Sequence, residues 1–288
     1  MTAVEVDGVS LFYSEEGSGP PVVFVHGIPT DYRAWEAQRT TLSGEFRTVR
    51  YSRRYAYPNP RIGDLADSTV ENNALDLAGL IAKLGLAPVH LVGHSYGGFI
   101  AAYLALRQPT LLRSLTLVEP AIASLLLRDP KSRAQAFGLL LRHPRVAFSA
   151  SKFLRESNAP ALEALRRNDT AAAVRFNLDG VENRKGVLEQ LPEPIRKMML
   201  DNGRTVKETD TPFPVVSRGE LKTLRVPTLL VHGVTSALWL RAITEMAAAA
   251  IPGATTVTVP NSGHYPHFQN PAPFNTALLA FLRRVSAG

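Results

Sequence analysis

The chain has 288 residues, of which 45% are hydrophobic and 20% are charged, and it contains no cysteine. This composition supports a packed core and excludes a disordered, collagen-like or disulfide-rich chain. Without a thiol, the protein cannot use a thiolate metal site, a cysteine nucleophile or a thiol redox switch. Any catalysis therefore uses oxygen and nitrogen groups.

Hydropathy and charge limit the partners of the chain. No stretch approaches the about 18 uninterrupted apolar residues of a membrane span, and Glu5 and Asp7 stand where a secretory signal would be cationic. We therefore expect a cytoplasmic protein with no membrane partner. The net charge of +7 is concentrated in residues 121–222, where 18 basic and 12 acidic side chains are mixed without interleaved aromatic residues. This pattern favours a solvated surface, so no nucleic-acid partner is expected.

The elements alternate along most of the chain. Val4–Asp7 and Ser10–Ser14 flank Gly8 and predict an antiparallel hairpin. Short β-branched runs then predict buried strands at Pro21–Val25, Thr48–Tyr51, Val89–Val92, Ser114–Val118, Thr228–Val231 and Thr255–Val259. Helical spacing predicts helices at Tyr32–Leu42, Ser68–Gly85, Tyr96–Arg107, Leu238–Ala250 and Pro273–Val285. This alternation indicates a parallel sheet covered on both faces.

The helix at Ser68–Gly85 has the clearest local signals. Ser68 is expected to cap its N-terminus, and Glu71 follows three residues later, as in a capping box. Leu75 is expected to be one of the apolar residues at helical spacing.

The alternation stops at Pro120 and resumes at Val226. The residues between them predict helices at Leu125–Leu141, Ala147–Arg155, Pro160–Arg167, Thr170–Asn177 and Pro194–Leu200, and no strand. The flanking segments are too short to close separate sheets. We therefore predict one α/β domain, residues 1–120 and 223–288, with a helical insertion at residues 121–222.

The strongest chemical signal is Gly93-His94-Ser95-Tyr96-Gly97, between a predicted strand and a predicted helix. A sharp strand-to-helix turn needs glycine on both sides of a strained serine, and it exposes the Ser95 hydroxyl at the carboxyl edge of the sheet. Open α/β sheets bind ligands at that edge. Ser95 is therefore the candidate nucleophile.

A hydroxyl nucleophile needs a base. Among the seven histidines, His264 follows the last predicted strand and is expected at the same edge as Ser95. His267 is the alternative base. The histidines next to glycines at strand ends, His26 and His94 among them, are expected to be packed and neutral.

The acid that orients the base must also lie at a strand end. No carboxylate follows Thr228–Val231 until Glu245, inside the next helix, whereas Glu119 directly follows Ser114–Val118. If that strand neighbours the one before Ser95, the two ends lie about 5 Å apart. Glu119 is therefore the candidate acid, and an exposed loop glutamate is the alternative interpretation.

The oxyanion of an acyl-transfer intermediate needs backbone donors. The amide of Tyr96, directly after the nucleophile, supplies one, and His26-Gly27-Ile28-Pro29 supplies the other from Ile28. Aromatic residues near predicted strand ends indicate a hydrophobic substrate pocket lined by Trp35, Tyr96, Trp239 and Tyr265. Trp35 and Trp239 fit the core equally well.

Together, these motifs resemble the α/β-hydrolase superfamily, specifically its capped serine hydrolases of the esterase and lactonase type. His26-Gly27-Ile28-Pro29, the serine turn, the strand-end acid and Gly263-His264 occur in the order of that family. The resemblance implies an eight-stranded, mostly parallel sheet with helices on both faces and the hairpin at one edge. It also implies a helical cap between the sixth and seventh strands, above Ser95, and no cofactor; we assign no metal ligands.

Two positions depart from the family pattern. The family usually has aspartate where this chain has Ser236, and Glu119 on the sixth strand resembles the Ser-His-Glu set of some ester and lactone hydrolases. A frequent glycine-rich segment after the fourth strand is replaced by a loop with Arg53 and Arg54, which either border the pocket or are surface charges.

The sequence therefore favours a hydrolase that cleaves a small-molecule ester or lactone with a hydrophobic or aromatic group through an acyl-enzyme on Ser95. Two alternatives remain. One is a carbon–carbon bond hydrolase of diketones from aromatic catabolism, and the other is a ligand-binding relative without turnover. A homodimer is left open.

Overall fold

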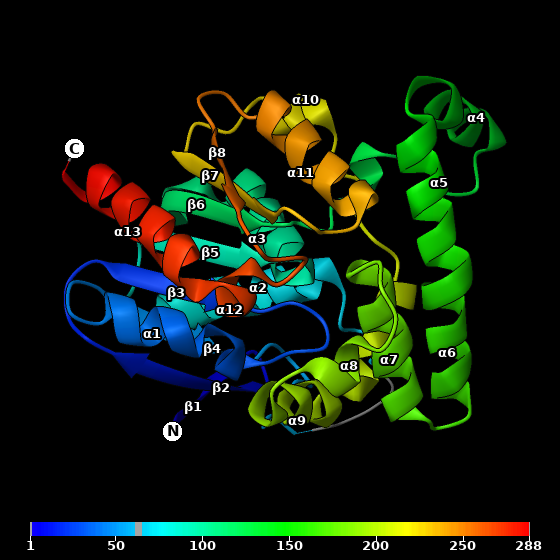
Figure 1. Ribbon diagram of the computed structural model, residues 1–288. Helices are drawn as coiled ribbons and strands as arrows, with labels where there is room; N and C mark the ends of the chain where they lie inside the picture. The colour runs from blue at the N-terminus through cyan, green and yellow to red at the C-terminus, as the bar shows by residue number, and fades with distance from the viewer. Residues whose placement is uncertain (1, 61–64, 288) are drawn as a thin grey trace.

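The computed structural model of the chain describes residues 2–60 and 65–287, and its centre is an eight-stranded sheet (Figure 1). The strands follow the order β1-β2-β4-β3-β5-β6-β7-β8. Their bounds are β1 Thr2–Val6, β2 Val9–Glu16, β3 Pro21–Val25, β4 Arg47–Tyr51, β5 Val89–His94, β6 Leu112–Val118, β7 Thr228–Gly233 and β8 Thr255–Val259. β1 and β2 form the antiparallel hairpin at one edge, β2 is antiparallel to β4, and the other pairs are parallel. The predicted fold class is confirmed.

The central strands are buried because helices cover both faces of the sheet. α1, α12 and α13 pack together on one face, and α2 and α3 pack together on the other (Figure 1). The helices of the core are α1 Glu36–Leu42, preceded by a 3₁₀ turn at Tyr32–Trp35, α2 Val70–Lys83, α3 Tyr96–Arg107, α11 Leu238–Ala250, α12 Pro266–Gln269 and α13 Pro271–Ala287. All six residues of β5 are buried, as expected for a strand at the centre of a parallel sheet.

Two details of α2 differ from the prediction. The helix is capped by Thr69, whose side chain accepts a hydrogen bond from the Asn72 amide, and not by Ser68. Ser68 instead donates its hydroxyl to the Glu208 carboxylate at 2.5 Å. Leu75 is 59% exposed, because helical geometry turns it away from the stripe that packs on the sheet.

The segment between β6 and β7 contains no strand, as predicted, and consists of helices joined by turns and loops. It comprises a 3₁₀ turn at Ala123–Leu125, α4 Arg133–Arg142, α5 Pro144–Phe153, a π-helical turn at Leu154–Asn158, α6 Ala159–Arg166, α7 Thr170–Val181, α8 Val187–Gln190, α9 Glu193–Asp201, a 3₁₀ segment at Gly203–Asp210 and α10 Arg218–Leu221. The continuous helix predicted at Leu125–Leu141 is wrong. Asp129 precedes a proline, which disfavours helix, and α4 begins only after Ser132 caps the Gln135 amide.

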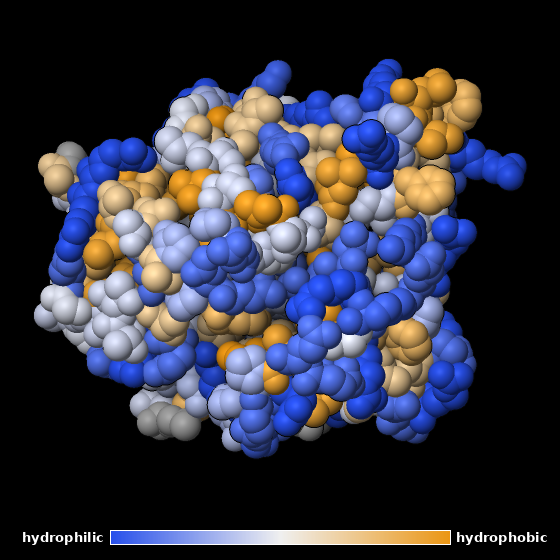
Figure 2. Space-filling view, viewed as in Figure 1, coloured by the Kyte–Doolittle hydropathy of each residue, from blue (hydrophilic) through white to orange (hydrophobic). Residues whose placement is uncertain are grey.

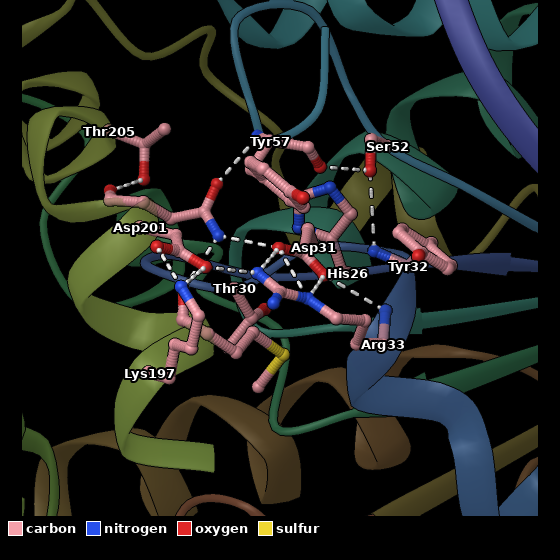
Figure 3. A network of polar contacts seen from close by, with 12 residues as sticks. His26, Thr30, Asp31, Tyr32, Arg33, Ser52, Tyr57, Lys197, Asp201 and Thr205 are labelled. Carbon is pink, nitrogen blue, oxygen red and sulfur yellow. Dashed lines mark hydrogen bonds and ion pairs between the residues drawn. The ribbon is translucent and has the colours of Figure 1, made fainter. Parts of the chain in front are cut away.

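Polar contacts join the second half of this helical segment to the core (Figure 3). The Arg33 guanidinium lies between the carboxylates of Asp31, at 2.6 Å, and Asp201 of α9, at 2.9 Å. The side chain of Asn202 donates to Asp31 at 2.7 Å and accepts from the Tyr57 amide at 2.8 Å. Because Asp31 and Asn202 are buried, these bonds fix α9 against the loop after β3.

A fully buried ion pair also attaches the helical segment to the core. It involves Arg53, one of the two arginines in the loop after β4. Arg53 and Glu208 are both 0% exposed and form paired hydrogen bonds of 2.8 and 3.1 Å. The Arg53 guanidinium lies 4.8 Å from the centre of the Tyr96 ring. Arg54 is also buried and pairs with Asp76. Both arginines are therefore structural, and neither is a surface charge.

Removing one member of the buried pair is expected to destabilise the fold. Glu208→Ala leaves the Arg53 guanidinium buried without its carboxylate, so the free energy of unfolding should fall by about 3–5 kcal/mol. The matched control is Glu163→Ala, which breaks an exposed pair with Arg166 and should cost less than about 1 kcal/mol. Urea unfolding measures both values. Equal losses in the two variants would contradict the stabilising role of the buried pair.

Candidate active site

Ser95 occupies the sharp turn between β5 and α3. Its backbone has φ 52° and ψ −118°, a strained conformation for a residue with a side chain. A Cβ atom at Gly97 would lie 2.4 Å from the backbone oxygens of Val25 and His26, so only glycine fits beside the serine. The turn thus places Ser95 at the N-terminus of α3, where it is 8% exposed.

Glu119 directly follows β6 and lies beside the serine turn. His94 pairs with Val118 in the register of β5 and β6, so Ser95 and Glu119 leave neighbouring strands at the same level. Glu119 is fully buried, and its Oε1 accepts a hydrogen bond from the Gly233 amide at 2.9 Å. The exposed loop glutamate considered as an alternative is therefore excluded.

The other carboxylate oxygen of Glu119 faces the imidazole of His264. His264 Nδ1 lies 2.8 Å from Glu119 Oε2, and the Ser236 hydroxyl donates to the same oxygen. Ser236, which stands where aspartate was expected from the family resemblance, thus binds the Glu119 carboxylate. Ser95 and His264 both line one cavity, although no hydrogen bond joins their side chains in this structure.

Burial controls the protonation of the Glu119–His264 pair. It raises the pKa of Glu119 to about 7, which the hydrogen bonds from Ser236 and Gly233 partly oppose. It lowers the pKa of His264 to about 3. The imidazole is therefore neutral at neutral pH, the form that can accept a proton.

Glu182, at the C-terminus of α7, was missed by the sequence analysis. It is 5% exposed, and its Oε1 accepts hydrogen bonds from the backbone amide of His264 and the side chain of Gln269, both at 3.0 Å. Burial raises the pKa of Glu182 to about 7, with a further contribution from the charge of Glu119. The one feature of the sequence that reflects this contact is the glycine at position 263, because a Cβ atom there would lie 2.1 Å from Glu182 Oε2.

The other histidines of this region are packed in the core. His94 Nε2 lies 2.8 Å from the backbone oxygen of His264, and His26 Nε2 accepts from the Arg53 amide at 2.9 Å. Burial lowers the pKa of both rings well below the usual value. His267, the alternative base, is fully buried, stacks on Trp35, and is not among the cavity residues.

The two expected oxyanion donors belong to residues that line the same cavity as the candidate nucleophile. Ile28 and Tyr96 line the cavity together with Ser95. Within the residues that the structure describes, neither backbone amide donates to another protein group. Both amides are therefore available to a ligand atom next to Ser95.

The cavity has a volume of about 210 Å³ and a mainly apolar wall. Its lining residues come from the core and from the helical segment between β6 and β7: Ile28, Ser95, Tyr96, Ala121, Ala123, Leu126, Leu127, Pro130, Leu139, Ala150, Phe153, Leu154, Asn158, Asn177, Val181, Thr209, Phe213, Trp239, Leu240 and His264. Of the four aromatic residues expected to contact substrate, Tyr96 and Trp239 belong to this set. Trp35 is packed against Phe24 in the core, and the Tyr265 hydroxyl donates to the Ile28 carbonyl at 3.3 Å.

Neither a metal cluster nor a membrane span is found in the described ranges. No group of three or more His, Asp or Glu side chains gathers there as it would around a metal ion. None of the helices there is both long and apolar enough to cross a bilayer.

Comparison with known proteins places the chain in a family. Residues 22–277 match the alpha/beta hydrolase family. The chain belongs to this family, and it is an α/β-hydrolase enzyme. It is similar to a thermophilic esterase from Thermogutta terrifontis, with 27% identity and a TM-score of 0.70 over 99% of this chain and 97% of that one.

Two further proteins are similar to the chain over nearly its whole length. A putative carbamate hydrolase from Azorhizobium caulinodans is 24% identical over 275 residues, which cover 96% of each chain. The enol-lactonase from Burkholderia xenovorans LB400 shares the fold, with a TM-score of 0.65 and 20% identity over 98% of this α/β-hydrolase and all of that chain.

Proposed function

We propose that this α/β-hydrolase is a serine hydrolase that cleaves a carboxylic ester or lactone with a medium-sized hydrophobic or aromatic group. The observation that carries the proposal is the Glu119–His264 contact of 2.8 Å, together with the position of His264 in the wall of the same cavity as the strained Ser95. The similarity to a thermophilic esterase at 27% identity supports an ester as substrate.

In the proposed mechanism, Ser95 Oγ attacks the carbonyl carbon while His264 Nε2 takes the hydroxyl proton. Glu119 holds the proton on Nδ1 and stabilises the imidazolium that forms. The amides of Ile28 and Tyr96 bind the oxyanion. The imidazolium then donates its proton to the leaving oxygen, and a water molecule activated by His264 hydrolyses the acyl-enzyme and releases the acid.

The helical insertion, residues 121–222, acts in this proposal as a cap over Ser95. Leu126, Leu139 and Phe153 come from it and form part of the cavity wall. A wall of this kind excludes water and binds the hydrophobic part of a substrate. Trp239 of α11, whose ring lies 4.7 Å from that of Phe153, would contact an aromatic group there.

The proposal is tested with a fluorophosphonate probe and a substrate panel on purified protein. Stoichiometric labelling of Ser95, found by peptide mass spectrometry, together with turnover of p-nitrophenyl esters or lactones, is the expected result. Turnover restricted to ring-fission diketones would replace the proposal by carbon–carbon bond hydrolysis. A folded protein that is neither labelled nor active would indicate a ligand-binding relative.

Glu182 acts in this mechanism as a positioning residue for His264. Glu182→Gln keeps an acceptor for the His264 amide but removes a negative charge close to the imidazolium, so kcat should fall by roughly 10- to 100-fold. Because burial raises the pKa of Glu182 to about 7, its charge is present mainly above that pH, so the loss of kcat should be largest above pH 7 and should shrink as the pH falls below it. The pH–kcat profile is measured on the best ester of the panel.

The matched control is Glu189→Gln, which removes an exposed carboxylate paired with Arg175. It should leave both kcat and the pH profile unchanged. A Glu182→Gln enzyme with the wild-type profile would show that this carboxylate only stabilises the loop.

A further inference from the structure

The excess positive charge of the protein is concentrated on one helical hairpin. Residues 128–155, which we call the α4–α5 hairpin, contain seven basic residues and one acidic residue, a net charge of +6 out of +7 for the whole chain. The basic residues are all exposed: Arg128, Lys131, Arg133, Arg142, Arg145, Lys152 and Arg155. In the described part of the chain none of them forms an ion pair, whereas many arginines of the core do.

The same hairpin carries an exposed apolar patch, formed by Phe137, Leu140, Leu141 and Phe148. These side chains are 61%, 46%, 68% and 70% exposed. The first three stand on one face of α4, at spacings of three and four residues. Figure 2 shows hydrophobic residues gathered over α4 and the adjacent end of α5, with hydrophilic residues around them.

The hairpin is only weakly covered by the rest of the molecule. α5 has no buried residue and α4 has one, Leu139. The inner side of the hairpin lines the cavity through Leu139, Ala150 and Phe153, while the apolar patch faces outward. The hairpin therefore separates the active-site cavity from an apolar, cationic surface.

We propose that the α4–α5 hairpin docks on an anionic lipid surface. Large apolar side chains surrounded by unpaired cations match the two parts of such a surface, because the side chains enter the acyl region and the cations bind the headgroups. A second copy of this chain is disfavoured as the occupant, since a symmetric contact would bring two clusters of net charge +6 together. No membrane partner was expected because the sequence contains no apolar stretch long enough for a span, and peripheral docking needs none.

The proposal is tested by co-sedimentation of the intact protein with lipid vesicles. The protein should bind vesicles of phosphatidylcholine and phosphatidylglycerol in a 7:3 ratio at low salt, and it should bind pure phosphatidylcholine vesicles much less. Binding should weaken as salt is raised. No binding to the anionic vesicles would overturn the proposal.

Two variants separate the apolar and the cationic contributions. Leu141→Asp/Phe148→Asp should abolish vesicle binding, and Arg142→Glu/Arg145→Glu should weaken it by roughly 30-fold or more, since each cation near an anionic surface contributes about fivefold. Neither pair lines the cavity. Thermal unfolding checks that both variants stay folded, which is expected because all four side chains are exposed.

The matched controls are Leu75→Asp on α2, a leucine that is 59% exposed, and Lys222→Glu/Arg225→Glu before β7. Both should bind vesicles as the wild type does, and equal loss in them would overturn the proposal. Vesicle binding that depends on the cations but not on Leu141 and Phe148 would also overturn it, because these side chains would then not enter the acyl region. A dimer in sedimentation equilibrium that the hairpin variants dissociate, without vesicle binding, would assign the patch to self-association.

Discussion

Replacing Ser95 by alanine is expected to lower the kcat for ester hydrolysis by roughly 10⁶-fold, the size of loss seen when a hydrolase loses its serine nucleophile. The alanine keeps the Cβ and therefore the backbone conformation at φ 52°, so the fold should be unchanged. Only the oxygen that is proposed to attack the substrate is removed. The remaining turnover would come from the oxyanion amides and from substrate binding in the cavity.

Active-site titration and steady-state kinetics on the same ester measure this loss. Ser43→Ala, after the C-terminus of α1, is the control and should keep the wild-type kcat. If Ser95→Ala retained wild-type turnover on every ester that the enzyme hydrolyses, the acyl-enzyme mechanism would be wrong.

Much of the core could be predicted because most of its strands are short β-branched runs. β3 and β8 have the bounds expected from sequence, but only β3 is buried as expected. β8 is mostly exposed, because it is the last strand of the sheet and has a neighbour on one side only. The placement of Glu119 depended on one assumption, that the strand before it neighbours the strand before Ser95. Parallel pairing of β5 with β6 supplies that neighbour, and the matching register of His94 and Val118 brings both strand ends to the same level.

The contacts across long sequence separations could not be predicted in the same way. Glu182 reaches the His264 amide from a helix 82 residues earlier in the chain, and Arg53 meets Glu208 across 155 residues. No local pattern distinguishes these glutamates from exposed ones, because burial is decided by tertiary packing. The break at Asp129-Pro130 was visible in the sequence, but the apolar residues on both sides outweighed it in the helix prediction.

Glu119→Gln is expected to lower kcat by roughly 10⁴-fold, and the structure explains why a nearly isosteric change should have so large an effect. The Gly233 amide donates to Oε1, so the glutamine carbonyl oxygen must occupy that place. Its NH₂ group then faces Nδ1 of His264 and Ser236. The glutamine nitrogen and a protonated Nδ1 would then both present hydrogens to each other. The imidazole is therefore driven to the tautomer with its proton on Nε2, and this nitrogen cannot accept the proton of Ser95.

Steady-state kinetics on the best ester, with circular dichroism to confirm the fold, test this expectation. The matched control is Glu245→Gln, which changes an exposed carboxylate of α11, the first one in the sequence after β7, and should leave kcat unchanged. A loss in the control with no loss at position 119 would move the acid back to the seventh strand. Such a result would contradict the geometry, since Glu119 is the carboxylate that contacts Nδ1 and Ser236 stands where the usual aspartate would be.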